Sequence, residues 1–201
     1  MKNIYLILIL LFSNIVKSQI IVDITDTTYS SINNTFYNYY KKDLNNVLNP
    51  FQGTYIYTNG NTSFKIVLKK MIKQTEGLHF EDLIIGEYQY IVNGVEIINT
   101  LSNLDVIYDN QYIKHAIAGN SPISNNNRAW KCPQCSPNEK RLRARIIDRN
   151  TDRYASIYMR KTIVSGQEIL QVKIGQIQPA FENMNPPDFS LPKGEFTMMK
   201  Q

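Results

Sequence analysis

After Pro50, apolar and polar residues alternate along the chain, and this alternation limits the possible folds more than any other feature of the sequence. The clearest runs are residues 64–69, 141–146 and 170–174. Successive side chains of a β-strand point to opposite faces, so a strand with this pattern buries one face and exposes the other to water. The sequence therefore predicts a series of half-buried strands.

Turn-forming dipeptides separate these runs. Asn59-Gly60 and Asn93-Gly94 tolerate the positive φ angles of type I′ turns, and Ser165-Gly166 lies between two further apolar runs. The predicted strands are 53–59, 61–72, 81–92, 95–101, 106–117, 140–148, 153–164, 168–176 and 195–200. Their sequential order, with no convincing helix between them, implies an all-β fold built as an antiparallel up-and-down meander. Because such strands must bury their apolar faces and protect their edges, we expect a small barrel or a two-layer sandwich over residues 50–201.

Three other parts of the chain do not show this alternation. Residues 19–49 are rich in Thr, Ser and Asn, and we expect a loosely structured lead-in there. A short helix over residues 31–47 is one form that it could take, and Pro50 would end such a helix. The proline-containing segments 119–138 and 178–193 are predicted to be long loops.

Residues 1–18 have the pattern of a secretory signal peptide. Lys2 precedes an apolar stretch over residues 4–12, and Val16-Lys17-Ser18 precedes Gln19. The stretch is too short to span a bilayer, and no cysteine near the cleavage point could carry a lipid, so we expect a protein exported to the periplasm or secreted, without a transmembrane anchor. Cleavage would remove Lys2 and Lys17 and lower the formal net charge from +5 to +3. That small excess does not indicate a nucleic-acid partner.

Several motifs in the first half of the strand region resemble a known family. They are residues 48–55 (LNPFQGTY), Asn59-Gly60-Asn61-Thr62, residues 67–70 (VLKK), residues 86–90 (GEYQY), Asn93-Gly94-Val95-Glu96 and residues 99–101 (NTL). Together they resemble a family of small exported flavobacterial proteins with no assigned function. The resemblance implies an exported single-domain protein, and it supplies neither an activity nor site residues.

The start of the first predicted strand is also similar to that of the lipocalin-type barrels. Those barrels open with an apolar residue, then Gly, one residue and Trp, and Phe51, Gly53 and Tyr55 match this spacing with Tyr in place of Trp. The similarity implies a lipocalin-like barrel. Gly-x-aromatic also occurs wherever a backbone bends sharply beneath a ring, and a shared fold would not by itself assign a function.

Cys132-Pro133-Gln134-Cys135 is the sharpest local motif. A redox pair would stand at the start of a helix in a βαβ unit, which the sequence does not show. A zinc site would need two further ligands, and His79 and His115 are isolated. In an exported protein the spacing favours a disulfide that stiffens the loop around Trp130, and we expect neither a metal nor a cofactor.

Two sets of side chains are candidates for ligand binding. Arg143 and Arg145 share one face of a strand with Arg141, and they would either contact an anionic ligand or form a solvated face. Tyr55, Tyr88 and Tyr90 would either line an amphipathic pocket inside a barrel or form part of the core.

The chain shows no pattern typical of an enzyme. His115 has Asp109 six residues away but no nucleophile motif, and no phosphate loop or dinucleotide fingerprint is present. We therefore expect a non-enzymatic protein that binds a small amphipathic, glycan-like or anionic ligand. The alternative is an interaction or structural protein of the cell envelope that has no ligand pocket.

Overall fold

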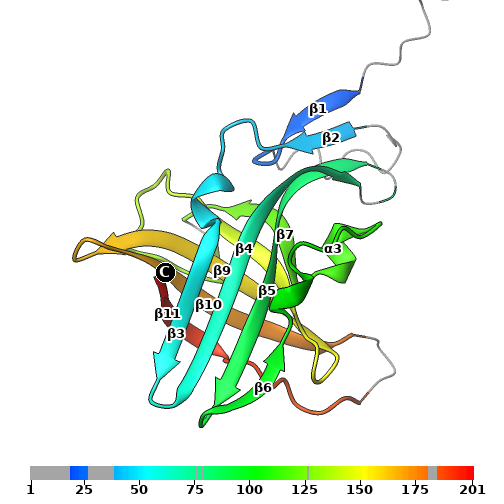
Figure 1. Cartoon of the computed structure of the whole chain (residues 1–201). Coiled ribbons are helices and arrows are strands. Elements are labelled where there is room, and N and C mark those ends of the chain that lie inside the picture. Colours follow the sequence, from blue (N-terminus) through cyan, green and yellow to red (C-terminus); the bar gives the residue numbers. More distant parts are fainter. Residues whose placement is uncertain (1–18, 27–38, 76, 78, 126, 181–184) are drawn as a thin grey trace, which may run out of the picture.

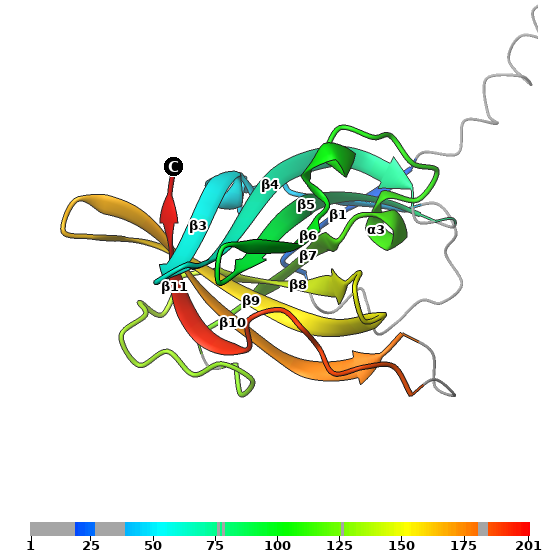
Figure 2. The ribbon, with the colours of Figure 1, turned by 60° about the horizontal axis from the view of Figure 1, so that its bottom comes forward.

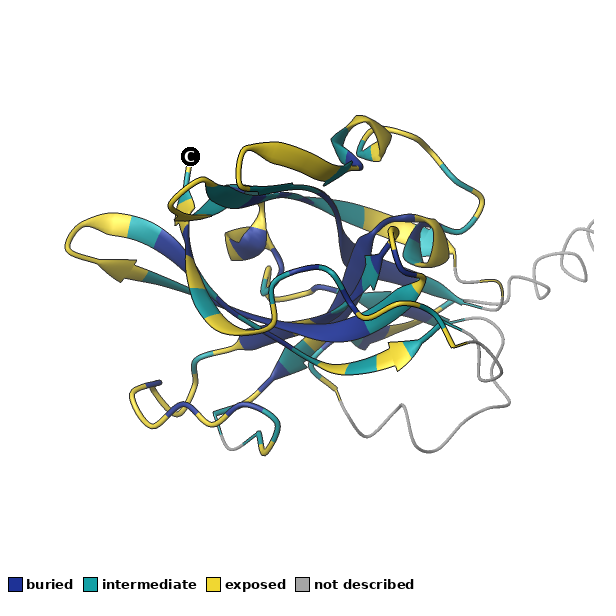
Figure 3. Cartoon of the chain, turned by 90° about the horizontal axis from the view of Figure 1, so that it is seen from below, coloured by how far each residue is buried: buried dark blue, intermediate teal, exposed yellow. Residues whose placement is uncertain are grey.

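Eight antiparallel strands form a closed β-barrel, as seen in a computed structural model that describes residues 19–26, 39–75, 77, 79–125, 127–180 and 185–201 (Figure 1). In order around the barrel they are β3 (Gly53–Asn59), β4 (Thr62–Thr75), β5 (Phe80–Val92), β7 (Ile117–Ile123), β8 (Arg141–Asp148), β9 (Arg153–Val164), β10 (Gln167–Pro179) and β11 (Gly194–Lys200). β11 pairs with β3, and the view from below shows the resulting ring of strands (Figure 3). The all-β meander is confirmed, and its closure selects the barrel over the sandwich.

Two of the three predicted glycine-containing turns have the expected chemistry. Asn93 and Gly94 have φ angles of 51° and 81°, and Ser165 and Gly166 have φ angles of 50° and 78°, as a type I′ turn requires. In the hairpin between β3 and β4 the central pair is Gly60-Asn61, one residue later than predicted, because Asn59 still pairs with Thr62. Only Gly60 of this pair has a positive φ, 58°.

The strand predicted over residues 106–117 is wrong. Residues 100–116 contain the 3₁₀ turn η2 (Leu101–Asn103) and the one-turn helix α3 (Gln111–Lys114), and β7 follows inside the segment predicted to be a loop. The presence of Pro122 was one reason to predict a loop over residues 119–138. β5 pairs with β7 only as far as Gly119, so one edge of β7 is free beyond that residue and a proline is tolerated.

Three further strands extend the barrel sheet. β2 (Tyr39–Lys42) runs parallel to the start of β5, β1 (Ile20–Asp23) runs parallel to β2, and β6 (Val95–Asn99) forms a hairpin with β5. The segment expected to be loose thus contributes two strands. Residues 31–38 of the helix considered there lie outside the described residues, and the rest of its span begins with strand β2. No helix within the described residues has the length and apolar character needed to cross a membrane.

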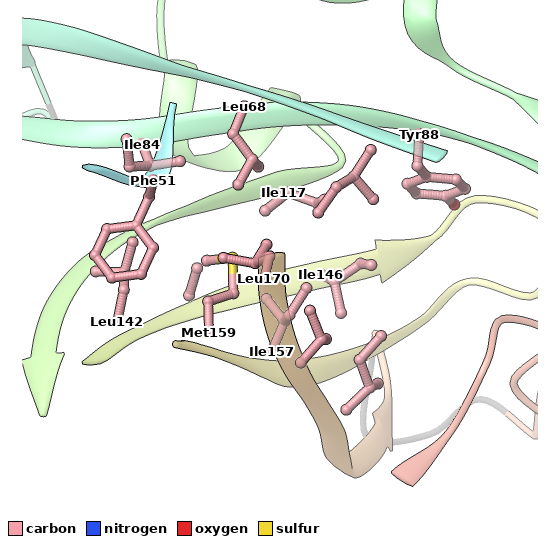
Figure 4. Close-up of a cluster of buried hydrophobic side chains, with 14 of the residues drawn as sticks. Phe51, Leu68, Ile84, Tyr88, Ile117, Leu142, Ile146, Ile157, Met159 and Leu170 are labelled. Carbon is pink, nitrogen blue, oxygen red and sulfur yellow. The ribbon is translucent and has the colours of Figure 1, made fainter. Parts of the chain in front are cut away.

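Buried side chains fill the interior of the barrel. Alternate residues of every barrel strand point inward, and ten of the buried residues are labelled in Figure 4: Phe51, Leu68, Ile84, Tyr88, Ile117, Leu142, Ile146, Ile157, Met159 and Leu170. Leu48, which precedes the 3₁₀ turn η1 (Asn49–Phe51), and Phe51, the last residue of that turn, complete this core ahead of β3. The ligand-accessible surfaces must therefore be sought at the ends and on the outer wall of the barrel.

Candidate functional site

Tyr55 and Tyr88 are buried in the filled core, which favours the core role that the sequence left open over a role in ligand binding. Both residues are fully buried. The Tyr55 hydroxyl lies 3.3 Å from the carbonyl oxygen of Gln52, and burial raises the pKa of Tyr55 to about 12. The Tyr88 hydroxyl donates to the Ile147 carbonyl over 2.9 Å and accepts from the Arg149 amide over 3.0 Å, and burial raises its pKa further. These bonds satisfy the hydroxyls inside the protein.

Tyr90 lies apart from the other two tyrosines, in the next inward-facing layer of the barrel. It is half-buried and lines a hollow of about 280 Å³ at the end of the barrel where β3 and β5 finish (Figure 1). This hollow, here called the mouth hollow, is lined by Tyr57, Asn59, Thr62, Tyr90, Pro192, Lys193, Glu195 and Phe196.

Arg141 is on the predicted face of β8 but is fully buried rather than solvated. Its guanidinium donates to the carbonyl oxygens of Trp130 and Ser124, the latter over 3.0 Å, and its central carbon lies 5.0 Å from the centroid of the Trp130 ring. Arg141 thus fastens the loop after β7 to the barrel. The predicted disulfide between Cys132 and Cys135 is confirmed in that loop.

Arg145 and Arg143 occupy the next outward positions of β8. Arg145 donates to the carbonyl oxygens of Tyr112 and Ile113, the latter over 3.2 Å, and its guanidinium carbon lies 5.0 Å from the centroid of the Tyr112 ring. Arg143 is exposed, and its Nε and Nη2 donate to Ser156 Oγ over 3.3 and 3.1 Å. It forms no ion pair with any residue that the structure describes. Arg143 is therefore a predicted anion contact that is exposed and whose positive charge no described carboxylate neutralises.

Both arginines line a pocket of about 360 Å³ on the outer wall of the barrel, here called the wall pocket. It opens over β7, β8, β9 and β10, the last three of which lie side by side in Figure 2. Its other lining residues are Lys41, Glu81, Tyr112, Gly119, Asn120, Ser121, Ala144, Tyr154, Ala155, Ser156, Gln176 and Gln178. The structure thus brings together Arg143 and Arg145 and keeps the predicted tyrosines away from them.

Two β-bulges shape the wall pocket. The β7–β8 register shifts between Ala118 and Ser121, and the β9–β10 register shifts between Gly175 and Gln178. Within the second bulge Gln176 has a φ of 56°, a left-handed conformation that is uncommon for a residue with a side chain. Bulges redirect side chains and are frequent beside functional sites.

Small residues form the floor between these bulges. Gly119, Ala144 and Ala155 line the pocket, and a Cβ at Gly119 would lie 2.7 Å from the Cα of Ala144. The close approach of β7 and β8 at this floor therefore requires glycine at position 119.

Hydrogen bonds fix the polar groups around the floor. Gln176 Oε1 accepts from Ser156 Oγ over 2.9 Å and from the Tyr158 hydroxyl over 2.7 Å. The single carboxylate in the lining, Glu81, has its oxygens 2.6 Å from His79 Nε2 and 2.6 Å from Asn120 Nδ2. Because Lys41 and both arginines are cationic, positive charge exceeds negative charge in this lining.

A second polar cluster lies between β5 and the segment over residues 100–116. His115 Nδ1 lies 2.8 Å from Glu87 Oε1, and His115 Nε2 lies 2.8 Å from Gln111 Oε1. Both His115 and Glu87 are buried, and the covering segment separates them from solvent. The sequence suggested Asp109 as a neighbour of His115, but Glu87 contacts it because β5 pairs with β7. These contacts hold the segment over residues 100–116 against β5.

Sequence reasoning did not find several residues of the wall pocket, including Tyr112, Tyr154, Gln176 and Ser121. Tyr154 had one usable signal, because it takes an outward position on a strand next to the arginines. The others are brought in by a one-turn helix and by two bulges, neither of which the alternation of apolar residues reveals.

A family model matches residues 1–201, the whole chain, and describes a family of unknown function, DUF6705. The chain belongs to the DUF6705 family. Comparison with curated proteins and with solved structures gives no match. Membership of DUF6705 confirms the expected family without an assigned function, whereas the flavobacterial origin, the export and the lipocalin-like character stay predictions.

Proposed function

We propose that this DUF6705 protein is a non-enzymatic binding protein that holds a small, anionic, glycan-like ligand in the wall pocket. The proposal rests on the exposure and the hydrogen bonding of Arg143. Its guanidinium is exposed and oriented by Ser156, and it has no carboxylate partner among the described residues. A guanidinium held in this way is suited to a carboxylate or another oxyanion, because charge-assisted hydrogen bonds to oxyanions are strong and directional.

The remaining lining supports a polyhydroxylated ligand. Gln176, Gln178 and Ser121 are exposed amide and hydroxyl side chains, which donate to and accept from hydroxyl groups. Tyr112 and Tyr154 add two half-buried rings with apolar faces. The volume of about 360 Å³ lies within the usual range of small-molecule sites, roughly 300–1,000 Å³.

The second candidate function is an interaction protein of the cell envelope, and one observation favours it. The hairpin of β9 and β10 projects from the barrel, and Ile163 and Val164 beside its turn are 64% and 52% exposed (Figures 1 and 2). Exposed branched apolar residues on a protruding hairpin would suit contact with another protein. Such a protein would need neither Arg143 nor the wall pocket.

Calorimetric titration with trigalacturonate tests the proposal, with the fully methyl-esterified trisaccharide as a probe of the same size without charge. We expect binding of the acid form only, and a loss of about tenfold or more in affinity for Arg143→Glu. Lys65→Glu is the matched control, because it reverses an equal charge on β4 away from the pocket. Equal losses from the two reversals would refute the proposal and leave only general attraction between opposite charges.

A further inference from the structure

The mouth hollow differs from the wall pocket in the chemistry of its lining. Tyr57, Tyr90 and Phe196 pack against the core cluster yet remain half-buried, whereas Tyr55, Tyr88 and Met198 in the layer above them are fully buried. The filled core therefore stops short of this end of the barrel. The unfilled space has a volume of about 280 Å³.

Aromatic rings form the base and the walls of the mouth hollow. Phe64 is fully buried beneath it, and its ring centroid lies 5.8 Å from that of Tyr90 and 6.3 Å from that of Phe196, both at steep interplanar angles. Tyr57 packs against Phe196 with a centroid separation of 5.1 Å. Each ring is held at a fixed angle by another, so their free faces are already oriented before a ligand arrives.

Two hydroxyl groups of this hollow have no hydrogen-bond partner in the described part of the chain. The hydroxyls of Tyr57 and Tyr90 make no hydrogen bond to a residue that the structure describes, although burial and the neighbouring Tyr57 raise the pKa of Tyr90. Asn59 and Thr62 add an amide and a hydroxyl at the rim. The lining holds one cation, Lys193, and one anion, Glu195, so its own formal charges cancel, and Glu195 also pairs with Lys173 outside the lining over 3.5 Å.

We propose that the mouth hollow binds a single neutral sugar ring, a pyranose, with its C–H face against the aromatic rings and its hydroxyls toward the rim. Aromatic faces combined with unused hydroxyl and amide groups suit a ring that is apolar on its faces and polar at its edge. The balanced rim gives no preference for a charged ligand. Phe64 and Tyr88 close the hollow on the side that faces the core, so the site has no room for a long apolar chain.

This site is independent of the function proposed for the wall pocket. Among the lining residues of the two hollows none is shared. Loss of one site should therefore leave ligand binding at the other unchanged, which makes the two proposals separable by experiment.

Saturation-transfer NMR with a panel of methyl hexosides (methyl β-glucoside, β-galactoside and α-mannoside) tests the inference. We expect at least one hexoside to bind at millimolar concentration and to receive saturation mainly at its ring C–H protons. Asn59→Trp should abolish this signal, because the indole fills the hollow while every core side chain remains. Tyr90→Phe should weaken binding by roughly fivefold, because it removes one hydroxyl and keeps the ring.

Arg143→Glu and Tyr154→Phe, both in the wall pocket, are the controls and should leave the hexoside signal unchanged. Circular dichroism spectra and thermal midpoints verify that each variant is folded. The inference is overturned if none of the three hexosides binds the wild-type protein, or if the signal persists in folded Asn59→Trp. Trigalacturonate titrated into Asn59→Trp reports on the wall pocket alone, so a failure at either site is assigned without ambiguity.

Discussion

Arg141, Arg143 and Arg145 show how three identical side chains on one face of one strand acquire different roles. Arg141 is covered by Trp130 and the loop after β7, Arg145 is covered in part by α3, and Arg143 is covered by neither. Burying a guanidinium is costly unless its donors are bonded, and in Arg141 carbonyl oxygens accept from Nη1 and Nη2 in place of a carboxylate, whereas Nε has no hydrogen-bond partner among the described residues. Burial lowers the pKa of Arg141.

We expect Arg141→Met to lower the free energy of unfolding by about 3 kcal/mol. The substitution keeps a long apolar stem but leaves the carbonyl oxygens of Trp130 and Ser124 without their charged donor. Equilibrium unfolding in urea measures the change, and the fluorescence of Trp130, the single tryptophan, should shift to longer wavelength as the loop loosens. Arg143→Met serves as the control and should change stability by about 0.5 kcal/mol or less. Equal effects of the two substitutions would contradict the role given to Arg141.

Glu168 supplies a prediction about pH. Its carboxylate accepts hydrogen bonds from Lys161 and Lys200, which lower its pKa from 4.5 to about 2. Because the folded-state pKa lies below the unfolded one, the stabilising contribution of these contacts is complete above pH 4.5 and is lost as the pH falls through about 2. An NMR titration of the Glu168 carboxyl carbon should show a midpoint near 2, and Lys161→Met should raise it. A wild-type midpoint near 4.5 would exclude this arrangement.

At the level of single residues, the sequence predicted the direction of a side chain better than its surroundings. Alternation correctly placed Arg141, Arg143 and Arg145 on one face of β8, opposite Leu142 and Ala144. Which segment covers that face depends on loops distant in the sequence. The alternation also correctly separated inward from outward positions at Tyr55 and Tyr88, but the filling of the barrel interior depends on all its strands together.

Close contacts between β4 and β5 explain the glycine at position 86. Gly86 faces Leu68 across the β4–β5 pair, and a Cβ there would lie 2.6 Å from Leu68 Cδ2 and 2.8 Å from the carbonyl oxygen of Val67. The absent side chain lets two long strands and the core approach each other. At Gly175, in contrast, no other atom lies within 4 Å of such a Cβ.

Gly86→Ala should therefore lower the free energy of unfolding by about 2 kcal/mol, because overpacking displaces both a core side chain and a backbone carbonyl. Gly175→Ala is the matched control, since it makes the same chemical change in a strand with open space, and it should be close to neutral. Thermal unfolding followed by circular dichroism compares the two variants. Similar midpoints would show that the space at Gly86 can expand.

The disulfide between Cys132 and Cys135 should have a local effect. The bond closes a ring of only a few residues, so the chain-entropy contribution to global stability is at most about 2 kcal/mol. Replacing both cysteines by serine should lower the urea midpoint less than Arg141→Met does. Titration of the protein purified without reductant should find no free thiol, and two reactive thiols per chain would disprove the bond.

The elements predicted correctly from the sequence are those with sustained alternation and a clear turn. β9 matches its predicted bounds, residues 153–164, and β3 matches residues 53–59. β7 was missed because it is short, contains Pro122 and carries a bulge, all of which weaken the alternation. β1 and β2 were missed because they pair in parallel outside the barrel, and no hairpin-turn motif in the sequence indicates such strands.

At the scale of the whole molecule, closure of the barrel depends on a short contact between distant parts of the chain. β11 meets β3 through the pairs Met199 with Ile56 and Lys200 with Tyr55. The sequence predicted that the strands would either close or fold over into two layers, because an open sheet of this size would expose two edges, and it did not decide between the two. The presence of hollows outside a filled interior was not foreseeable, since it depends on side-chain volumes across eight strands.

The filled interior leads to a prediction about ligand class. We expect no saturable binding of palmitate to the native protein, because fully buried Phe64, Tyr88 and Ile146 leave no channel for an alkyl chain. Calorimetry and native mass spectrometry measure this directly, with serum albumin as a positive control for the palmitate preparation. A stoichiometric palmitate complex would show that the core can open, and it would restore the barrel interior as a ligand site.

The location of both hollows outside the sealed core also bears on how this scaffold can change over generations. Residues such as Gln176, Tyr154, Asn59 and Lys193 are at least partly exposed, and replacing them removes little packing energy. Selection can therefore alter what the surface recognises while Leu68, Ile117 and Leu170 continue to secure the fold. Substitutions at the two hollows should therefore cost little stability. In a protein whose ligand occupies the core, the same kind of change would lower stability toward the threshold needed for folding.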